Sequence, residues 1–355
     1  SAHRAVCARR WNIYSRSSKP ASGELSSDEP VDSVNVGVVG VGSLGFHHAR
    51  LLRALPDARL IGIYDIDSER ASQVASELET RAYTDLEPLL DDAQAITVAV
   101  PTSAHFEVGR SGLDAGCDLL IEKPITPTTA EADELIRLAS EKDRIIQVGH
   151  IERFNGAVRA CEPYLDRPLF VESHRLAPFV PRGTDVPVVL DLMIHDIDLI
   201  LSLVQGSVVD LRAVGVSVLS GSVDIANARL EFGDGAVANI TASRVSLQRQ
   251  RKIRFFQPNG YVSLDLGKGT GEFYRRKAGE PLGKGPLELG RFVEHVRLRG
   301  DGAEPLRLEL EAFLGAVRRE LPVAVSAQEG REALAVALDI IDRIERHRKN
   351  VLDTN

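Results

Sequence analysis

Two groups of ionisable side chains in this sequence have the types and the spacing that proton transfer requires. The first is Lys123 in the tripeptide E-K-P, which closes the apolar run 118–121. An ammonium group at the end of a buried strand is partly desolvated, so it could polarise a substrate hydroxyl or share a proton with it. Pro124 restricts Lys123 to extended backbone and is compatible with a cis bond. A solvated surface lysine remains the alternative.

The second group is Asp191 and His195 in the segment D-L-M-I-H-D-I-D, spaced so that on a helix they share one face. Imidazole groups ionise near neutral pH, which suits a general base, and Asp191 could orient that base or bind a neighbouring hydroxyl. The alternative is a helix that carries ordinary polar residues. One observation argues against this alternative. The helix already has an apolar stripe, and polar side chains that lie beside such a stripe need hydrogen-bonding partners. The stripe consists of Leu190, Ile194, Ile197 and Leu201.

A glycine-rich turn, G-V-G-S-L-G, lies between the apolar run 34–41 and a helical stretch at 44–55. The first glycine permits a tight turn, the second lets a pyrophosphate approach the backbone, and the third lets the helix pack closely on the strand. Backbone N–H groups at the start of that helix would face the phosphates of a dinucleotide. The predicted phosphate-binding residues are Gly40, Gly42, Ser43, Leu44 and Gly45.

An acidic residue follows the second apolar run at the distance that a dinucleotide-binding strand pair requires. Asp65 lies 20 residues after Gly45, where its carboxylate could accept both ribose hydroxyls of the adenosine. A carboxylate there repels a 2′-phosphate, so the position favours NAD over NADP. Asp65 could instead cap the following helix, although Asp67 is better placed for that role. A nicotinamide cofactor accepts a hydride from the substrate, so the protein itself must remove the proton from the alcohol that is oxidised.

Further candidate cofactor residues follow two other apolar runs of the N-terminal half. Pro101, Thr102 and His105 come after the run 95–100, and the pair Glu122-Lys123 comes after the run 118–121. In an open parallel sheet these positions share the carboxyl edge, where ligands bind. We therefore expect all five residues to contribute to the cofactor site.

The elements that must position these residues alternate between apolar strands and helices up to residue 148. We predict strands at 34–41, 59–64, 81–83, 95–100, 118–121 and 145–148, with helices at 44–55, 68–78, 106–115 and 129–141. Such alternation is typical of a doubly wound parallel sheet buried on both faces. Residues 34–152 are thus predicted to form an NAD-binding Rossmann domain.

After residue 152 the pattern changes to period-2 segments with turns between them. Helices are expected at 156–164, 190–204, 306–320 and 330–348, and strands at 169–176, 208–219, 226–232, 236–245, 252–256 and 261–266. The turns F-G-D-G-A and P-N-G-Y indicate hairpins. Residues 153–350 should therefore form an α/β domain with an open, mostly antiparallel sheet, whose final helix could pack back on the Rossmann domain.

Taken together, the glycine turn, E-K-P, V-G-H-I-E-R-F-N at 148–155 and D-L-M-I-H-D-I-D resemble the glucose-fructose oxidoreductase / inositol dehydrogenase / MocA family. The resemblance implies that Lys123, Asp191 and His195 form the catalytic set, with His195 as acid/base and all three touching the substrate. It also implies assembly into a homodimer or homotetramer through the C-terminal sheet. Within the family the motifs are most similar to the branch that oxidises the 3-hydroxyl of UDP-N-acetylglucosamine to a 3-keto sugar.

A diphosphate-bearing substrate requires arginine or amide donors nearby. Candidate substrate ligands are Arg153 and Asn155, which follow a strand on the cofactor-facing edge, together with His174, Arg175 and Arg182. The sequence leaves the side-chain direction of His174 open, and simple solvation remains the alternative for both Arg175 and Arg182. Two other functions also remain open: a dehydrogenase of a free polyol such as inositol, and a non-catalytic NAD-sensing protein.

Composition excludes several classes of function. The 355 residues carry a net charge of −8, which argues against a nucleic-acid partner, and no apolar stretch is long enough to cross a membrane. The three scattered cysteines fit a reducing cytosol rather than a disulfide framework. No histidine has metal-ligand spacing, so we expect no metal. Residues 1–33 are basic and lack periodicity, and we expect a poorly ordered arm there, with a transit peptide as the alternative.

Overall fold

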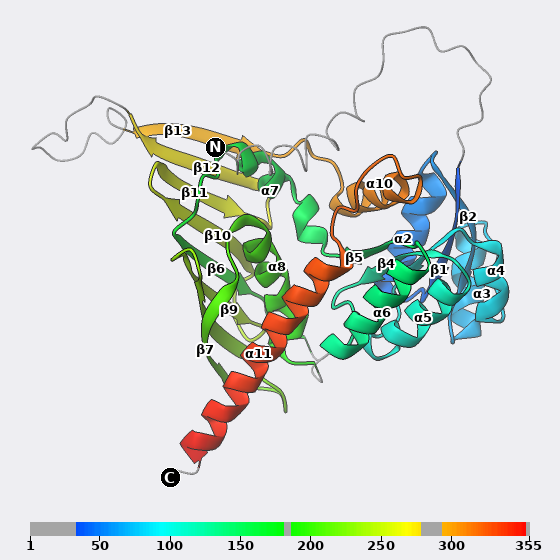
Figure 1. Ribbon diagram of the computed structural model, residues 1–355, viewed down its shortest axis with the longest axis horizontal. Coiled ribbons are helices and arrows are strands. Elements are labelled where there is room, and N and C mark those ends of the chain that lie inside the picture. The colour runs from blue at the N-terminus through cyan, green and yellow to red at the C-terminus, as the bar shows by residue number, and fades with distance from the viewer. Residues whose placement is uncertain (1–32, 181–185, 278–292, 353–355) are drawn as a thin grey trace, which may run out of the picture. The chain divides into compact units, whose positions relative to one another are not determined.

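The computed structural model describes residues 33–180, 186–277 and 293–352 (Figure 1). The predicted N-terminal arm, apart from residue 33, and Arg182 lie outside these ranges. The chain divides into two compact units. The N-terminal unit runs to Ile151 and includes Glu304–Leu334, and the C-terminal unit comprises Glu152–Ala303 and the chain from Ala335 on. Within the described ranges, no helix is long and apolar enough to span a membrane.

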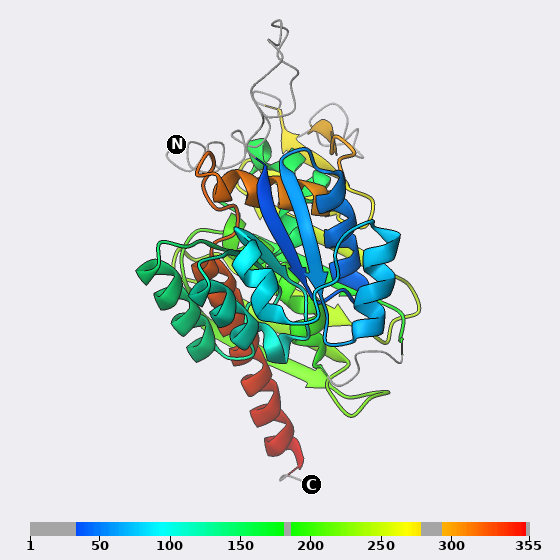
Figure 2. The same ribbon diagram turned by 90° about the vertical axis from the view of Figure 1, so that its right-hand side faces the viewer.

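The N-terminal unit is built on a five-stranded parallel sheet with the order β2-β1-β3-β4-β5. Figure 2 shows its first two strands in blue, side by side. Its strands are β1 (Val34–Val39), β2 (Ala58–Tyr64), β3 (Ala95–Val98), β4 (Asp118–Glu122) and β5 (Ile146–Gly149). Every residue of β3, β4 and β5 is buried, as continuous apolar runs covered on both faces require. The predicted Rossmann-type fold is confirmed.

Five helices alternate with these strands: α2 (Ser43–Ala54), α3 (Ser68–Glu77), α4 (Leu86–Asp92), α5 (His105–Asp114) and α6 (Thr129–Glu141). Helix α4 was not predicted, because its short sequence contains a proline and too few residues to show a period. The predicted strand at 81–83 is only an isolated bridge between Ala82 and Ile63.

Residues 304–334 group with the N-terminal unit. Helix α10 (Pro305–Val317) places Leu306, Leu310 and Phe313 in the same buried cluster as apolar residues of β1 and α2. Burial of this apolar stripe explains why the segment belongs to the N-terminal unit. Helix α11 (Ala327–Leu352) then contributes residues to both units, and the assignment of 153–350 to one domain stays a prediction.

The C-terminal unit is built on an eight-stranded sheet with the order β13-β12-β11-β10-β6-β9-β8-β7. All neighbours are antiparallel except β6 and β9. The strands are β6 (Phe170–Leu176), β7 (Val208–Val216), β8 (Ile225–Phe232), β9 (Val237–Ser243), β10 (Gln250–Gln257), β11 (Gly260–Asp265), β12 (Thr270–Arg276) and β13 (Val293–Arg299). The predicted second sheet, open and mostly antiparallel, is confirmed.

Two helices, α7 (Gly156–Cys161) and α8 (Ile194–Leu203), pack against one face of this sheet (Figure 1). The other face, which we call the open face, carries an aromatic ladder with one ring on each of five adjacent strands. The ladder consists of Phe170, Phe256, Tyr261, Tyr274 and His295, which are mutual register partners. Successive ring centroids lie 4.5–5.6 Å apart. Strand alternation thus separates a covered face from a face of half-buried and exposed rings.

Candidate active site

The glycine turn after β1 packs so closely that side chains at two of its three glycines would collide with backbone. Gly40 has a φ of +85°, and a Cβ there would lie 2.8 Å from the backbone carbon of Ala99. A Cβ at Gly45 would collide with the carbonyl oxygen of Gly40, so the start of α2 can pack this closely only with glycine. Nothing lies within 4 Å of a Cβ at Gly42, where the turn faces open space.

Helix α2 begins at Ser43 directly after this open position. Its N-cap has no side-chain hydrogen bond, and its first turn contains no acidic residue. Free N–H groups and the positive end of a helix dipole suit a diphosphate. The residues present therefore fit the phosphates of a dinucleotide.

Asp65, immediately after β2, faces the same turn with both carboxylate oxygens engaged by backbone. Oδ2 accepts the N–H of Val41 at 2.7 Å, and Oδ1 accepts the N–H of Asp67 at 3.0 Å. Each oxygen keeps a second lone pair, and the side chain is only half-buried, so ribose hydroxyls can still bind. The N-cap of α3 is Asp67, which accepts the N–H groups of Glu69 and Arg70. Helix capping is therefore assigned to Asp67, and ribose binding by Asp65 stays a prediction.

His105 joins the two loops at the carboxyl edge of the parallel sheet. Its imidazole is 1% exposed, with Nδ1 at 2.9 Å from the carbonyl oxygen of Pro124 and Nε2 at 3.0 Å from that of Val100. Burial lowers the pKa of His105, although both carbonyls act in the opposite direction. Both ring nitrogens face backbone carbonyls, so His105 holds the two loops together, and its contribution to the cofactor site stays a prediction. Pro101 and Thr102 begin one loop, and the cis peptide Lys123-Pro124 begins the other.

Glu122, the last residue of β4, is buried beside Lys123. Its Oε1 lies 3.0 Å from Nε2 of His48, and its Oε2 accepts the N–H of Lys123 at 3.2 Å. Burial by itself raises the pKa of Glu122. The hydrogen bond and charge of His48 and the Lys123 ammonium outweigh it, so the pKa lies below its ordinary value. Lys123 itself is half-buried at the edge of the sheet.

In the C-terminal unit, Asp191 and His195 lie at the junction of two helical forms. Residues Val189–Met193 form a π-helical turn, and α8 continues from Ile194. The expected single α-helix is therefore wrong in its first turn. Both polar side chains are half-buried, whereas Ile194 and the residues around it are mostly buried. Single π turns within helices occur frequently at functional sites.

Helix α8 is held by two buried ion pairs, through Asp196 and Asp198, which follow His195 on the helix. Arg175 contacts Asp196 through Nε at 2.7 Å and Glu152 through Nη1 at 2.8 Å. Arg153 binds both oxygens of Asp198, with Nε at 2.8 Å and Nη2 at 2.6 Å. Burial by itself lowers the pKa of Arg175, but the carboxylates of Asp196 and Glu152 raise the pKa by more than burial lowers it. The guanidinium therefore stays charged. The ion pairs tie α8 to β6 and to the turn that contains residues 152 and 153.

Three of the predicted substrate ligands belong to this buried network. Arg153 and Arg175 are 3% and 2% exposed. Asn155 caps α7 through the N–H of Ala157 and donates to the carbonyl of Leu266. These contacts give the three residues a positioning role, and direct substrate binding by them stays a prediction.

His174 neighbours Arg175 in β6 but points to the other side of the sheet. It lines a small hollow on the open face with Glu172, Lys252 and Arg254, whereas Arg175 contacts α8. Strand alternation separates the two side chains. The structure therefore does not bring His174 together with Asp191 and His195.

Sequence reasoning assigned no role to several residues on which these sites depend: His48, Glu152, Asp196 and Asp198. The signal for the aspartates was their place in the H-D-I-D motif, two carboxylates on a largely apolar helix. His48 likewise lies on the buried side of α2. Among the described residues, no cluster of three or more metal-ligating side chains occurs. Independence from metal stays a prediction.

Known proteins match both units. Residues 34–150 fit the GFO_IDH_MocA model, described as an oxidoreductase family with an NAD-binding Rossmann fold, and residues 156–263 fit the GFO/IDH/MocA C-terminal domain. The UDP-N-acetylglucosamine 3-dehydrogenase of Acidithiobacillus ferrooxidans is 39% identical over 88% of this chain and 97% of its own. A solved structure of that enzyme superposes with a TM-score of 0.82 at 37% identity, covering 88% of this chain and 98% of that one. The myo-inositol 2-dehydrogenase of Thermotoga maritima is 26% identical over 90% of this chain and 99% of its own.

Proposed function

Because this chain belongs to the GFO/IDH/MocA family of NAD-binding oxidoreductases, we propose that it oxidises a secondary hydroxyl of a sugar, specifically the 3-hydroxyl of a UDP-N-acetylhexosamine. The assignment of this substrate is supported by the similarity to a UDP-N-acetylglucosamine 3-dehydrogenase, which extends over 97% of that enzyme. Inositol dehydrogenases match at clearly lower identity.

The N-terminal unit holds NAD through the residues that fit it. The backbone N–H groups of Ser43 and Leu44, beside Gly42, bind the diphosphate, and Asp65 accepts hydrogen bonds from the ribose hydroxyls. Asp65 also repels a 2′-phosphate, which favours NAD. Bound NAD supplies the hydride acceptor.

Lys123, Asp191 and His195 are proposed to act on the hydroxyl that is oxidised. The proton of the hydroxyl oxygen passes to the imidazole of His195, and the Lys123 ammonium donates a hydrogen bond to that oxygen. The C–H bond of the same carbon breaks, its electron pair leaves as a hydride, and the C–O bond becomes a carbonyl. Asp191 orients the neighbouring sugar hydroxyl or the imidazole. Support comes from the family motif and from the half-buried placement of all three side chains.

Two assays separate this proposal from its rivals. The full chain with NAD should form NADH with UDP-N-acetylglucosamine and none with myo-inositol; the reverse would favour a polyol dehydrogenase. UDP-glucose is the matched control for the N-acetyl group, and we expect slower turnover with it. NAD binding by isothermal calorimetry without turnover of any sugar would favour a non-catalytic NAD-sensing protein.

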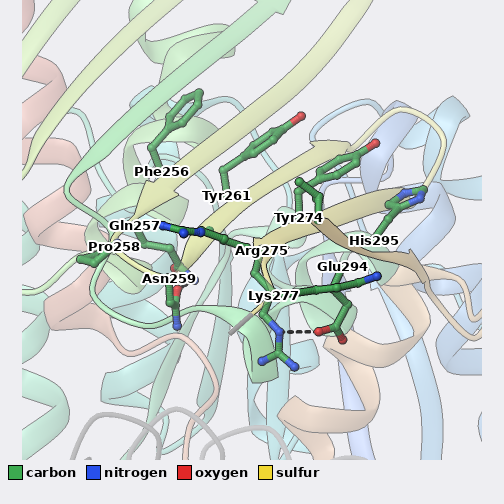
Figure 3. Close-up of a pocket in the computed structure, with 13 residues that line it drawn as sticks. Phe256, Gln257, Pro258, Asn259, Tyr261, Tyr274, Arg275, Lys277, Glu294 and His295 are labelled. Carbon is green, nitrogen blue, oxygen red and sulfur yellow. Dashed lines mark hydrogen bonds and ion pairs between the residues drawn. The ribbon is translucent and has the colours of Figure 1, made fainter. Parts of the chain in front are cut away.

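We further propose that the open face of the C-terminal sheet joins copies of the chain into a homodimer or homotetramer. The aromatic ladder crosses five strands of that face, and Figure 3 shows Phe256, Tyr261, Tyr274 and His295 in a row across neighbouring strands. Half-buried rings on adjacent strands are typical of association surfaces. Light scattering should show an oligomer that Tyr261→Arg dissociates and that Ser76→Arg, on α3, does not. A monomeric wild-type chain would contradict this.

The cytosol is the compartment that we propose for this enzyme. Cys117 is a free, buried thiol. Burial raises the pKa of Cys117 to about 11, so that thiol stays protonated and unreactive. Buried free thiols are typical of proteins in a reducing compartment. Labelled protein found in a cell fraction other than the cytosol would contradict the assignment.

A further inference from the structure

A buried histidine next to the catalytic lysine has no part in the chemistry described above. His48 lies on α2, in the second turn after the phosphate-binding end, and is 1% exposed. Its Nε2 lies 3.0 Å from Oε1 of Glu122, whose side chain is 11% exposed. A buried polar pair costs free energy unless its geometry is satisfied, so such a pair beside Lys123 requires an explanation.

Glu122 connects His48 to the backbone of Lys123. While Oε1 contacts His48, Oε2 accepts the N–H of Lys123 at 3.2 Å. Glycine at residue 149 of the neighbouring strand leaves room for the carboxylate. A Cβ at Gly149 would lie 3.1 Å from both the carboxyl carbon and Oε2 of Glu122. The carboxylate is therefore confined between α2, β5 and the start of the Lys123 loop.

The charges around Glu122 favour its ionised form. His48 of α2 and Lys123 of the same loop both lower the pKa of Glu122, against the effect of burial. His105 of α5 also faces the carboxylate closely enough for its own pKa to respond to it, and His150 follows Gly149 of β5. An ionised carboxylate in turn favours the ammonium form of a nearby lysine.

We propose that His48 is a positioning residue: its hydrogen bond fixes the Glu122 carboxylate, and this carboxylate sets the backbone geometry and the protonation state of Lys123. The inference depends on the proposed function only for the role of Lys123 in catalysis. His48 touches neither substrate nor reacting atoms, and it acts through Glu122.

The direct test is the titration of Lys123 by NMR in the full chain with NAD bound. The chain has eight lysines, so selective labelling of the lysine ε carbons gives few signals, and Lys123→Arg identifies the one that matters. Loss of the neighbouring carboxylate charge in Glu122→Gln should lower the titration midpoint of Lys123 by about 1 pH unit. His48→Phe should lower it in the same direction, and His48→Gln, which can still donate a hydrogen bond, should restore it.

The matched control is His47→Phe, because His47 is exposed on the same helix one residue earlier. It should leave the midpoint unchanged. A wild-type midpoint in His48→Phe would overturn the role of His48, and a wild-type midpoint in Glu122→Gln would overturn the link through the carboxylate. If His48→Phe does not fold, as circular dichroism would show, the midpoints of Glu122→Gln and His48→Gln decide.

A kinetic readout separates this inference from the proposed function. With UDP-N-acetylglucosamine, His48→Phe should lower kcat at least 10-fold and shift the alkaline limb of the pH–rate profile to lower pH, because the Lys123 ammonium is lost earlier, with the KM for NAD unchanged. A purely structural role would not move that limb. If the wild-type chain turns over no nucleotide sugar, the proposed function fails, while the NMR titration still tests the role of His48.

Discussion

At the residue scale, two neighbouring aspartates divide the tasks that the sequence left undecided. Asp67 caps α3 through the N–H groups of Glu69 and Arg70. Asp65 holds the glycine turn through the N–H of Val41 and keeps lone pairs for a ligand. Residue types and spacing predicted this division correctly for the cap. They could not predict that Asp65 also braces the turn, because that contact depends on the folded loop.

This division predicts opposite effects for two matched variants. Asp65→Ala should weaken NAD binding at least 10-fold, because two charge-assisted hydrogen bonds to the ribose are lost. Asp67→Ala should leave the NAD affinity near wild type and lower the free energy of unfolding by about 1 kcal/mol, through loss of the cap. Calorimetric titration and urea denaturation measure the two quantities. Equal NAD affinities in the two variants would argue against the ribose role of Asp65.

Loss of either proposed acid–base residue should slow turnover without preventing NAD binding. His195→Ala and Lys123→Ala should each lower kcat by roughly 100-fold to 10,000-fold while NAD still binds. Lys142→Ala, an exposed lysine after α6, is the control and should retain full activity. Steady-state NADH formation measures the effect. Wild-type turnover in either alanine variant would remove that residue from the mechanism.

At the element scale, helix α8 shows why much of the site could not be predicted from the sequence. The apolar stripe and the motif indicated a helix with Asp191 and His195, and the helix is present. Charged residues are ordinarily assigned to the surface, so the buried pairs of Asp196 and Asp198 with arginines went unpredicted. The π turn before α8 leaves no signal in apolar periodicity. Strands β12 and β13 were missed for a related reason: each buries few apolar side chains among charged ones.

The ion pairs of α8 give a prediction about stability. Arg175→Met leaves Asp196 and Glu152 buried without their partner, which should cost about 3–5 kcal/mol in the free energy of unfolding. Arg254→Met breaks a more exposed pair with Glu172 and should cost no more than about 1 kcal/mol. Urea denaturation of both variants compares them. Similar losses in the two would mean that the buried network does not hold α8.

At the scale of the whole molecule, stability should fall as the solution becomes acidic. The pKa of His105 is lowered in the folded chain by burial, so the folded state binds fewer protons than the unfolded state. Stability is then fully present above the unfolded pKa of about 6.5 and is lost as pH falls below it. Burial by itself raises the pKa of Asp224, but hydrogen bonds from Ser220 and its neighbours outweigh burial, so the pKa lies below its ordinary value. The stability that ionised Asp224 contributes is therefore lost at a still lower pH than the contribution of His105.

The expected loss of stability in acid can be measured by urea denaturation at about pH 7 and about pH 5. Wild type should lose stability between the two, and His105→Gln, which does not titrate, should lose less. A steeper loss in His105→Gln would contradict the assignment. The variant also reports on the two loops that His105 joins, because weaker NAD binding would follow if their geometry changed.

The central claim, that this enzyme removes a hydride from carbon 3 of a UDP-N-acetylhexosamine, is tested most directly by isotope transfer. UDP-N-acetylglucosamine carrying deuterium at carbon 3 is incubated with NAD and the full chain, and the reduced cofactor is analysed by mass spectrometry. We predict that the NADH formed carries the deuterium. Unlabelled NADH would place the oxidation at another carbon, and the absence of NADH would contradict the proposed substrate.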